Sequence, residues 1–274
     1  HTRCAVVTGV QTCALPILMN KNMPVMQIVG DLSTVGNSCF PTFVATQCDF
    51  LNKKLAPPAV FSANVEKRIT QFNQWFSKRC VSKGRVIPID SKRARWDKYK
   101  PHFFSMTDQY WLQYDKAERW DDLNFFTNDY SYATGDALLS KSLDWLETVP
   151  LCNNSPDITT NGVMNKRWIR DSSGKNILLK TSSDNVLQES KSEILATKFL
   201  ENYGRVPYVT YYPYIYNYSM CCACRNFVNE DLEFITAGNL FYTVKMTDET
   251  KKAEDKVYRS EERRVGKECR SRWS

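Results

Sequence analysis

Three stretches in the second half of the chain decide the fold: KRWIRDSSGKNILLK at 166–180, QESKSEILATKFLENYGRVPYV at 188–209 and YIYNYSMCCACRNFV at 214–228. In the first stretch two apolar runs flank Asp-Ser-Ser-Gly, which is typical of a β-hairpin. The second stretch has apolar residues at helical spacing and reaches a glycine, which is a helix stop signal. The third is rich in residues that favour strands. The pattern predicts a hairpin, then a helix, then two more strands.

The predicted helix, over 186–203, carries both an apolar stripe and acidic residues. Its buried stripe is expected to consist of Leu187, Ile194, Leu195, Phe199 and Leu200. Glu189 and Glu193 are four residues apart, so they lie one turn apart on one face of the helix. Lys180 ends the apolar run of the hairpin, and a helix carboxylate that follows such a lysine can form an ion pair with it. The alternative is a strand-end lysine that reaches water and glutamates on a solvated face.

A loop of small and hydroxyl residues, SPDITTNG at 155–162, precedes the hairpin. Such a loop lets backbone N–H groups approach phosphate oxygens closely. An ordinary surface turn has the same composition, so both interpretations stay open.

Both chain ends resemble translated sequencing adapters rather than protein that was selected to fold. Residues 1–17 include VTGVQTCALPI, and residues 259–274 read RSEERRVGKECRSRWS. We expect neither end to be native, and we expect the natural gene to continue past Tyr258. These ends hold seven basic and three acidic residues, so the net charge falls from +7 to +3 without them. That charge makes no strong case for direct nucleic-acid binding.

Cysteine and histidine usage limits the kinds of site that the remainder, 18–258, can build. Three of the ten cysteines lie in the two ends, and the odd number that remains predicts reduced thiols, a cytoplasmic protein and no structural zinc. Only His102 is left, which argues against histidine-based catalysis or a multi-histidine metal site. Cys221, Cys222 and Cys224 alternate along a predicted strand, which favours packing over a shared metal. No apolar run is long enough to cross a bilayer, so no membrane partner is expected.

The first half of the remainder is expected to be a small β-rich unit followed by a helical, aromatic connector. Apolar stretches alternate with turn residues over 19–55, and Asn64 is a candidate N-cap for a helix over 65–80. The basic stretch 83–100 is read as a solvated helix face, with a nucleic-acid contact as the less favoured alternative. Aromatic residues crowd the region 103–132 and are expected to pack in the core or between domains.

Prolines and asparagines around 150–156 mark a linker, and we place a domain boundary there. The expected organisation is an α+β fold with an N-terminal region over 18–150 and a second domain over 151–258. The second domain would be an antiparallel sheet with one main helix.

The ordered motifs SPDITTNG, KRWI, ILLK, QESKSEILATKF, VPYVTY and CRNFV resemble the HipA-like family of bacterial serine/threonine kinases, in its divergent Firmicutes branch. Upstream, FSMTDQYWLQ, WDDLNFF and GDALL resemble the region before the kinase domain in that branch. The similarity covers about 61–240. It implies that 151–258 form a kinase-like small lobe, truncated before the large lobe.

The resemblance implies ATP and magnesium as cofactors and, for the intact form, transfer of the ATP γ-phosphate to a Ser/Thr hydroxyl of a protein substrate. Lys180 would hold the ATP phosphates, and Glu193 would orient it, with Glu189 as the alternative. The phosphate loop, 155–162, would include Thr159, Thr160, Asn161 and Gly162. A serine or threonine of this loop would be the self-phosphorylation site, as in some relatives. Backbone groups of Cys224 to Phe227 would meet the adenine.

The chain departs from this family after Phe227. No Asp followed five residues later by Asn, and then by a metal-binding Asp, occurs there. The catalytic base and the magnesium ligands are therefore expected in a missing part, and this chain by itself is expected to be inactive and to bind ATP weakly. Apolar residues near the end are expected to lack partners and to lower solubility: Leu232, Phe234, Leu240 and Phe241.

A second function class stays open beside the kinase. The chain could be a non-catalytic interaction module that binds a DNA-binding antitoxin or a mobile-element protein. Under the kinase interpretation, replacing Lys180 by alanine should abolish nucleotide binding by the intact protein. Under the module interpretation the same change should leave partner binding unchanged.

Overall fold

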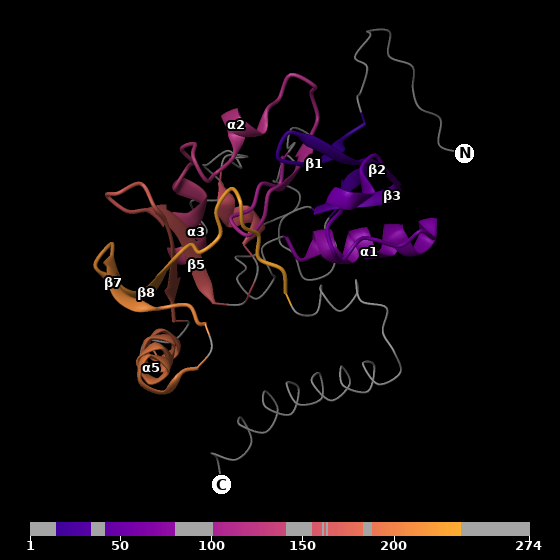
Figure 1. Ribbon diagram of the computed structural model, residues 1–274. Helices are drawn as coiled ribbons and strands as arrows, with labels where there is room; N and C mark the ends of the chain where they lie inside the picture. Colours follow the sequence, from indigo (N-terminus) through magenta and orange to yellow (C-terminus); the bar gives the residue numbers. More distant parts are fainter. Residues whose placement is uncertain are drawn as a thin grey trace. The chain divides into compact units, whose positions relative to one another are not determined.

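The computed structural model describes residues 15–33, 42–79, 101–140, 155–160, 162, 164–182, 188–205 and 207–236. Contacts divide the chain into one unit of His1–Phe234 and another of Ile235–Ser274. The helices and strands described below all lie in the first unit (Figure 1). They form two antiparallel four-stranded sheets with accompanying helices, which confirms the α+β class.

The first sheet has the strand order β3-β2-β1-β4 and confirms the predicted β-rich unit. Its strands are β1 (Ile17–Asn20), β2 (Met23–Ser33), β3 (Thr42–Phe50) and β4 (Tyr110–Gln113), and a short 3-10 helix, η1 (Lys53–Leu55), follows β3. The pairing of β2 with β3 shifts after Val29, where Gly30 faces Ala45. A Cβ atom on Gly30 would lie 2.1 Å from the carbonyl oxygen of Val44, so only glycine fits at this bulge.

Helix α1 (Val65–Ser77) covers the first sheet beside β3 (Figure 1). The Asn64 side chain accepts a hydrogen bond from the backbone N–H of Lys67 at 2.8 Å, which confirms the predicted N-cap. Asn73 of this helix hydrogen-bonds to the backbone of Ala45 on the edge strand β3. Its side chain accepts from the Ala45 N–H and donates to the Ala45 carbonyl, so these edge groups are paired. The helix ends at Ser77, earlier than predicted.

One group of buried residues, most of them aromatic, contains side chains from both sheets. We call it the shared cluster. Its members are Met19, Phe104, Met106, Trp111, Trp120, Phe125, Tyr130 and Trp168. The two short helices of the connector, α2 (Trp120–Leu123) and α3 (Ala133–Ser140), lie in the same region of the chain. The prediction that the connector aromatics pack in the core is confirmed for Phe104, Trp111, Trp120, Phe125 and Tyr130, whereas Tyr132 is 40% exposed.

The second sheet contains β5 (Asn165–Arg170), β6 (Asn176–Thr181), β7 (Tyr212–Tyr216) and β8 (Ser219–Arg225) in the order β5-β6-β8-β7. Helix α5 (Gln188–Tyr203) connects β6 to β7 in the sequence. The predicted succession of hairpin, helix and two strands is confirmed. Asp171 sets the hairpin turn, since its carboxylate accepts from the backbone N–H groups of Ser173 and Lys175.

The predicted buried stripe of α5 is wrong for two of its members. Leu195 is 70% exposed and Phe199 is 60% exposed, whereas Ile194 and Leu200 are half-buried and Ser190 and Thr197 are buried. These two hydroxyl residues hydrogen-bond to groups outside the helix, Ser190 to Ser182 and Thr197 to the N–H of Tyr211. Polar contacts therefore decide which face of α5 is buried. The spacing of apolar residues in the sequence does not predict such contacts. The fifth residue of the predicted stripe, Leu187, lies outside the described residues.

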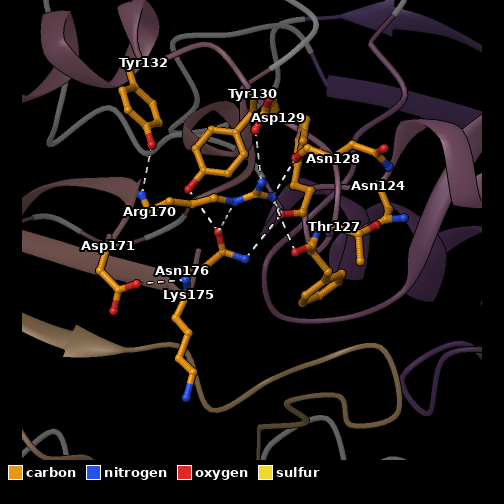
Figure 2. A network of polar contacts seen from close by, with 12 residues as sticks. Asn124, Thr127, Asn128, Asp129, Tyr130, Tyr132, Arg170, Asp171, Lys175 and Asn176 are labelled. Carbon is orange, nitrogen blue, oxygen red and sulfur yellow. Dashed lines mark hydrogen bonds and ion pairs between the residues drawn. The ribbon is translucent and has the colours of Figure 1, made fainter. Parts of the chain in front are cut away.

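Arg170, at the end of β5, forms hydrogen bonds between the connector and the second sheet (Figure 2). Its guanidinium donates to the carbonyls of Phe125 and Asn128 at 3.1 and 2.6 Å and to the Asn176 side chain at 3.1 Å. The ring of Tyr130 lies 5.3 Å from the guanidinium carbon. A planar fork of donors fits several acceptors at once, and a lysine ammonium does not.

We expect Arg170→Lys to lower the free energy of unfolding by about 2–3 kcal/mol, because several half-buried acceptors lose a donor. Arg225→Lys is the matched control, since Arg225 lies on the same sheet with a side chain 64% exposed. Urea denaturation followed by circular dichroism measures both. Equal stability of the two variants would contradict this role of Arg170.

Several predictions fall outside the described residues. These are the basic stretch 83–100, the linker and domain boundary near 150, the residue Asn161, and the apolar residues Leu240 and Phe241. In the described parts of the chain, every helix is too short or too polar to cross a bilayer.

Candidate functional site

Lys180 and Glu193 meet between the second sheet and helix α5. Lys180 lies near the end of β6, and Glu193 lies in the second turn of α5. The Lys180 Nζ donates to Glu193 Oε1 at 2.7 Å, and both side chains are mostly shielded from solvent. Of the two glutamates that the sequence offers as partners, Glu193 is the one that the structure places against Lys180.

Tyr211 and Cys224 complete the surroundings of the lysine. The Lys180 Nζ lies 4.3 Å from the ring centroid of Tyr211, and Tyr211 is close enough to Lys180 and Cys224 to change the pKa values of both. Burial lowers the pKa of Lys180, but its interactions with Glu193 and Tyr211 outweigh burial and raise the pKa above the ordinary value. The lysine is therefore fully charged at neutral pH. We call Lys180, Glu193, Tyr211 and Cys224 the lysine site.

A second lysine, Lys166, lies on the same face of the sheet as Lys180. The two residues are directly opposite each other in the β5–β6 pairing, and Cys222 is opposite Lys180 on the other side. The Lys166 ammonium also lies close to Gly162, where an added Cβ would be 2.4 Å from Nζ. Gly162 has φ +104°, which favours glycine. Sequence reasoning missed Lys166, although a four-residue turn at 171–174 fixes this register.

The segment before β5 is more enclosed than the loop that the sequence predicts. Residues Pro156–Thr159 form a 3-10 helix, η4, and all four are buried. The Thr159 hydroxyl donates to the carbonyl of Phe104 at 2.7 Å, and the Thr160 hydroxyl donates to that of Pro156. These contacts hold the segment in place, and binding of phosphate by Thr159 and Thr160 stays a prediction.

The exit from β8 was expected to meet the adenine. Cys224 is buried beside Tyr211, whereas Phe227 is 55% exposed and packs edge-on against Phe234 with ring centroids 5.7 Å apart. Between them, the backbone N–H of Asn226 is paired with the carbonyl of Asn176. The structure therefore brings Cys224 close to Lys180. Phe227 lies two residues beyond the end of β8, in the segment that follows the strand.

The cysteines of β8 are packing residues. Cys222 and Cys224 are opposite Lys180 and Leu178, so they share one face, and Cys221 points to the other face as predicted. Burial raises the pKa of each of the three thiols, which keeps them protonated and unreactive at neutral pH. Across the described ranges, no three His, Cys, Asp or Glu side chains are grouped so that they could hold a metal ion.

Searches of family models, of curated proteins and of solved structures found no match to this chain. The resemblance to the HipA-like kinases therefore stays a prediction from the motifs, and the geometry of the lysine site stands beside it as an independent observation.

Proposed function

We propose that residues 151–258 are the small lobe of a HipA-like serine/threonine protein kinase. The intact form would transfer the γ-phosphate of ATP to a hydroxyl of a protein substrate. The observation that carries this proposal is the 2.7 Å ion pair between the Lys180 Nζ on β6 and the Glu193 carboxylate on α5. Protein kinases use such a strand lysine, held by a helix glutamate, to contact the phosphates.

A second lysine on this face of the sheet supports a phosphate ligand. Lys166 and Lys180 are neighbours across the β5–β6 pairing, and lysine ammonium groups commonly bind phosphate. Magnesium supplies charge neutralisation on the phosphates when it is bound. We expect its ligands, and the catalytic base, in other parts of the intact protein, so this chain by itself should not turn over. A cytoplasmic location belongs to the same proposal, since the described cysteines are free thiols.

Titration of the 15N-labelled protein with Mg-ATP, followed by NMR chemical shifts, tests nucleotide binding because it detects millimolar affinities. We expect weak binding that shifts signals of β5, β6 and α5. Replacing Lys180 by methionine should weaken binding at least about tenfold, since a charged contact to phosphate is lost. Unchanged signals in the wild-type protein at millimolar Mg-ATP would contradict the proposal.

Lys175→Met is the matched control for this titration. Lys175 lies in the exposed turn of the same hairpin, so its replacement removes the same charge at a distance from the lysine site. We expect its affinity for Mg-ATP to equal that of the wild-type protein. If Lys175→Met and Lys180→Met weaken binding equally, the effect is one of net charge and Lys180 has no specific role.

A second candidate function, the non-catalytic interaction module, is favoured by one observation. Leu195, Phe199 and Tyr203 follow one another at four-residue spacing along α5 and are each at least 60% exposed. Exposed apolar stripes of this kind commonly bind protein partners, and a DNA-binding antitoxin-like protein is the partner class that this alternative implies. Under this alternative, Phe199→Ser should abolish partner binding and Lys180→Met should leave it unchanged in a co-purification experiment.

A further inference from the structure

Tyr211, just before β7, contacts the lysine of the proposed nucleotide site from a third element of the chain. Its ring centroid is 4.3 Å from the Lys180 Nζ, so the ammonium lies over the face of the ring. An ammonium has three N–H donors and no acceptor. The carboxylate of Glu193 takes one donor, and Tyr211 is a second contact that raises the pKa of the lysine.

Thr197 connects the two groups that hold the lysine. Its hydroxyl accepts from the backbone N–H of Tyr211 at 2.9 Å and donates to the carbonyl of Glu193 at 3.1 Å. The side chain is 2% exposed, so water does not compete well for these bonds. Because one buried hydroxyl bonds to both backbones, Tyr211 cannot shift far from the turn of α5 that carries Glu193.

We propose that Tyr211 is a second positioning residue of the lysine site, and that the Thr197 hydroxyl holds Tyr211 and Glu193 at a fixed separation around Lys180. This inference rests on the proposed function only in naming a nucleotide phosphate as the ligand of the lysine. One ion pair leaves an ammonium on a flexible stem several orientations. A second contact from another element reduces the number of orientations and leaves the other donors available to the ligand.

The pKa of Lys180 can be measured without any nucleotide, and it depends on the positions of Tyr211 and Glu193 around the ammonium. Protein labelled with 13C-lysine is titrated by NMR, and the Lys180 signal is assigned from its absence in Lys180→Arg. Tyr211→Phe keeps the ring and removes the hydroxyl, so we expect it to lower the pKa of Lys180 from the wild-type value. The other titratable groups around the ammonium, Lys166, Glu193, Cys222 and Cys224, are unchanged in this variant.

Thr197 provides a second, independent pair of variants. Thr197→Val has nearly the same shape without the hydroxyl, and we expect it to lower the pKa of Lys180 as well, since Tyr211 and Glu193 are no longer joined. Thr197→Ser keeps the hydroxyl and should restore the wild-type pKa. Tyr212→Phe is the matched control, because Tyr212 is opposite Ala223 and so faces the other side of the sheet.

The outcomes separate this inference from the proposed function. An unchanged pKa of Lys180 in both Tyr211→Phe and Thr197→Val overturns the inference, even if Lys180→Met loses Mg-ATP. A lowered pKa in both supports it, even if the wild-type protein fails to bind Mg-ATP. If the wild-type protein binds, Tyr211→Phe should weaken the affinity about five- to tenfold, because the lysine loses a polar group that favours its charged form.

Discussion

Replacing Arg167 by methionine is expected to lower the free energy of unfolding by about 3–5 kcal/mol, because the change removes a buried charge from its partners. Arg167 on β5 is 0% exposed, and its guanidinium pairs with the carboxylate of Asp136 and the hydroxyl of Tyr216. The rings of Tyr132 and Tyr216 lie 5.1 and 4.7 Å from the guanidinium carbon. Methionine fills a similar volume but removes the guanidinium donor, and among the described residues Asp136 then keeps only the hydrogen bond from the Tyr216 hydroxyl. Urea denaturation followed by circular dichroism gives the difference.

Asp136→Asn separates the contribution of the Arg167–Asp136 ion pair from that of the buried Arg167 guanidinium, because only the negative charge is removed. The Asp136 side chain is 40% exposed, so solvent screens its ion pair, and its loss should cost at most about 1 kcal/mol. If Asp136→Asn is as destabilising as Arg167→Met, the stability comes from the ion pair rather than from the buried guanidinium and its neutral acceptors.

Arg167 also shows where sequence reasoning reaches its limit. The hairpin, the turn at Asp171 and the N-cap at Asn64 follow from local rules, because each depends on residues within a few positions. Helix geometry places Glu189 and Glu193 on one face, and only the family resemblance favours Glu193 as the partner of Lys180. The partners of Arg167 are 31 and 49 residues away, and no local pattern brings them together.

The same distinction explains the errors around the lysine site. Leu195 and Phe199 have the spacing of a buried stripe, but the buried face of α5 is set by the hydroxyls of Ser190 and Thr197. Those hydroxyls bond to residues that come close only after the sheet has formed. Tyr211 was missed for the same reason, since its contact with Lys180 depends on where the chain reaches β7.

The exposed residues near the end of the described chain agree with one expectation from the sequence. Leu232 is 57% exposed and Phe234 is 49% exposed, although Phe234 packs against Phe227. Together with the stripe on α5, they form exposed apolar surface on the proposed small lobe. Low solubility of the isolated protein would follow from either set.

Trp111→Ala is expected to lower the free energy of unfolding by about 3–5 kcal/mol, which is a large part of the total for a domain. Trp111 on β4 is 0% exposed, stacks on Phe104 at 5.1 Å between ring centroids, and donates from its indole N–H to the carbonyl of Lys21 at 2.7 Å. The shared cluster that contains it also contains Trp168 of the second sheet. Alanine would therefore leave a cavity that both sheets line.

Trp111→Phe and Tyr218→Ala are the controls for this change. Phenylalanine keeps the aromatic contact and loses only the indole donor and part of the volume, so about 1–2 kcal/mol should be lost. Tyr218 is fully exposed at the β7–β8 turn, and its replacement should leave stability unchanged.

Amide hydrogen exchange then compares β2 with β6. Because the cluster belongs to both sheets, Trp111→Ala should speed exchange in both strands, and protection lost from β2 alone would mean that the sheets are stabilised separately.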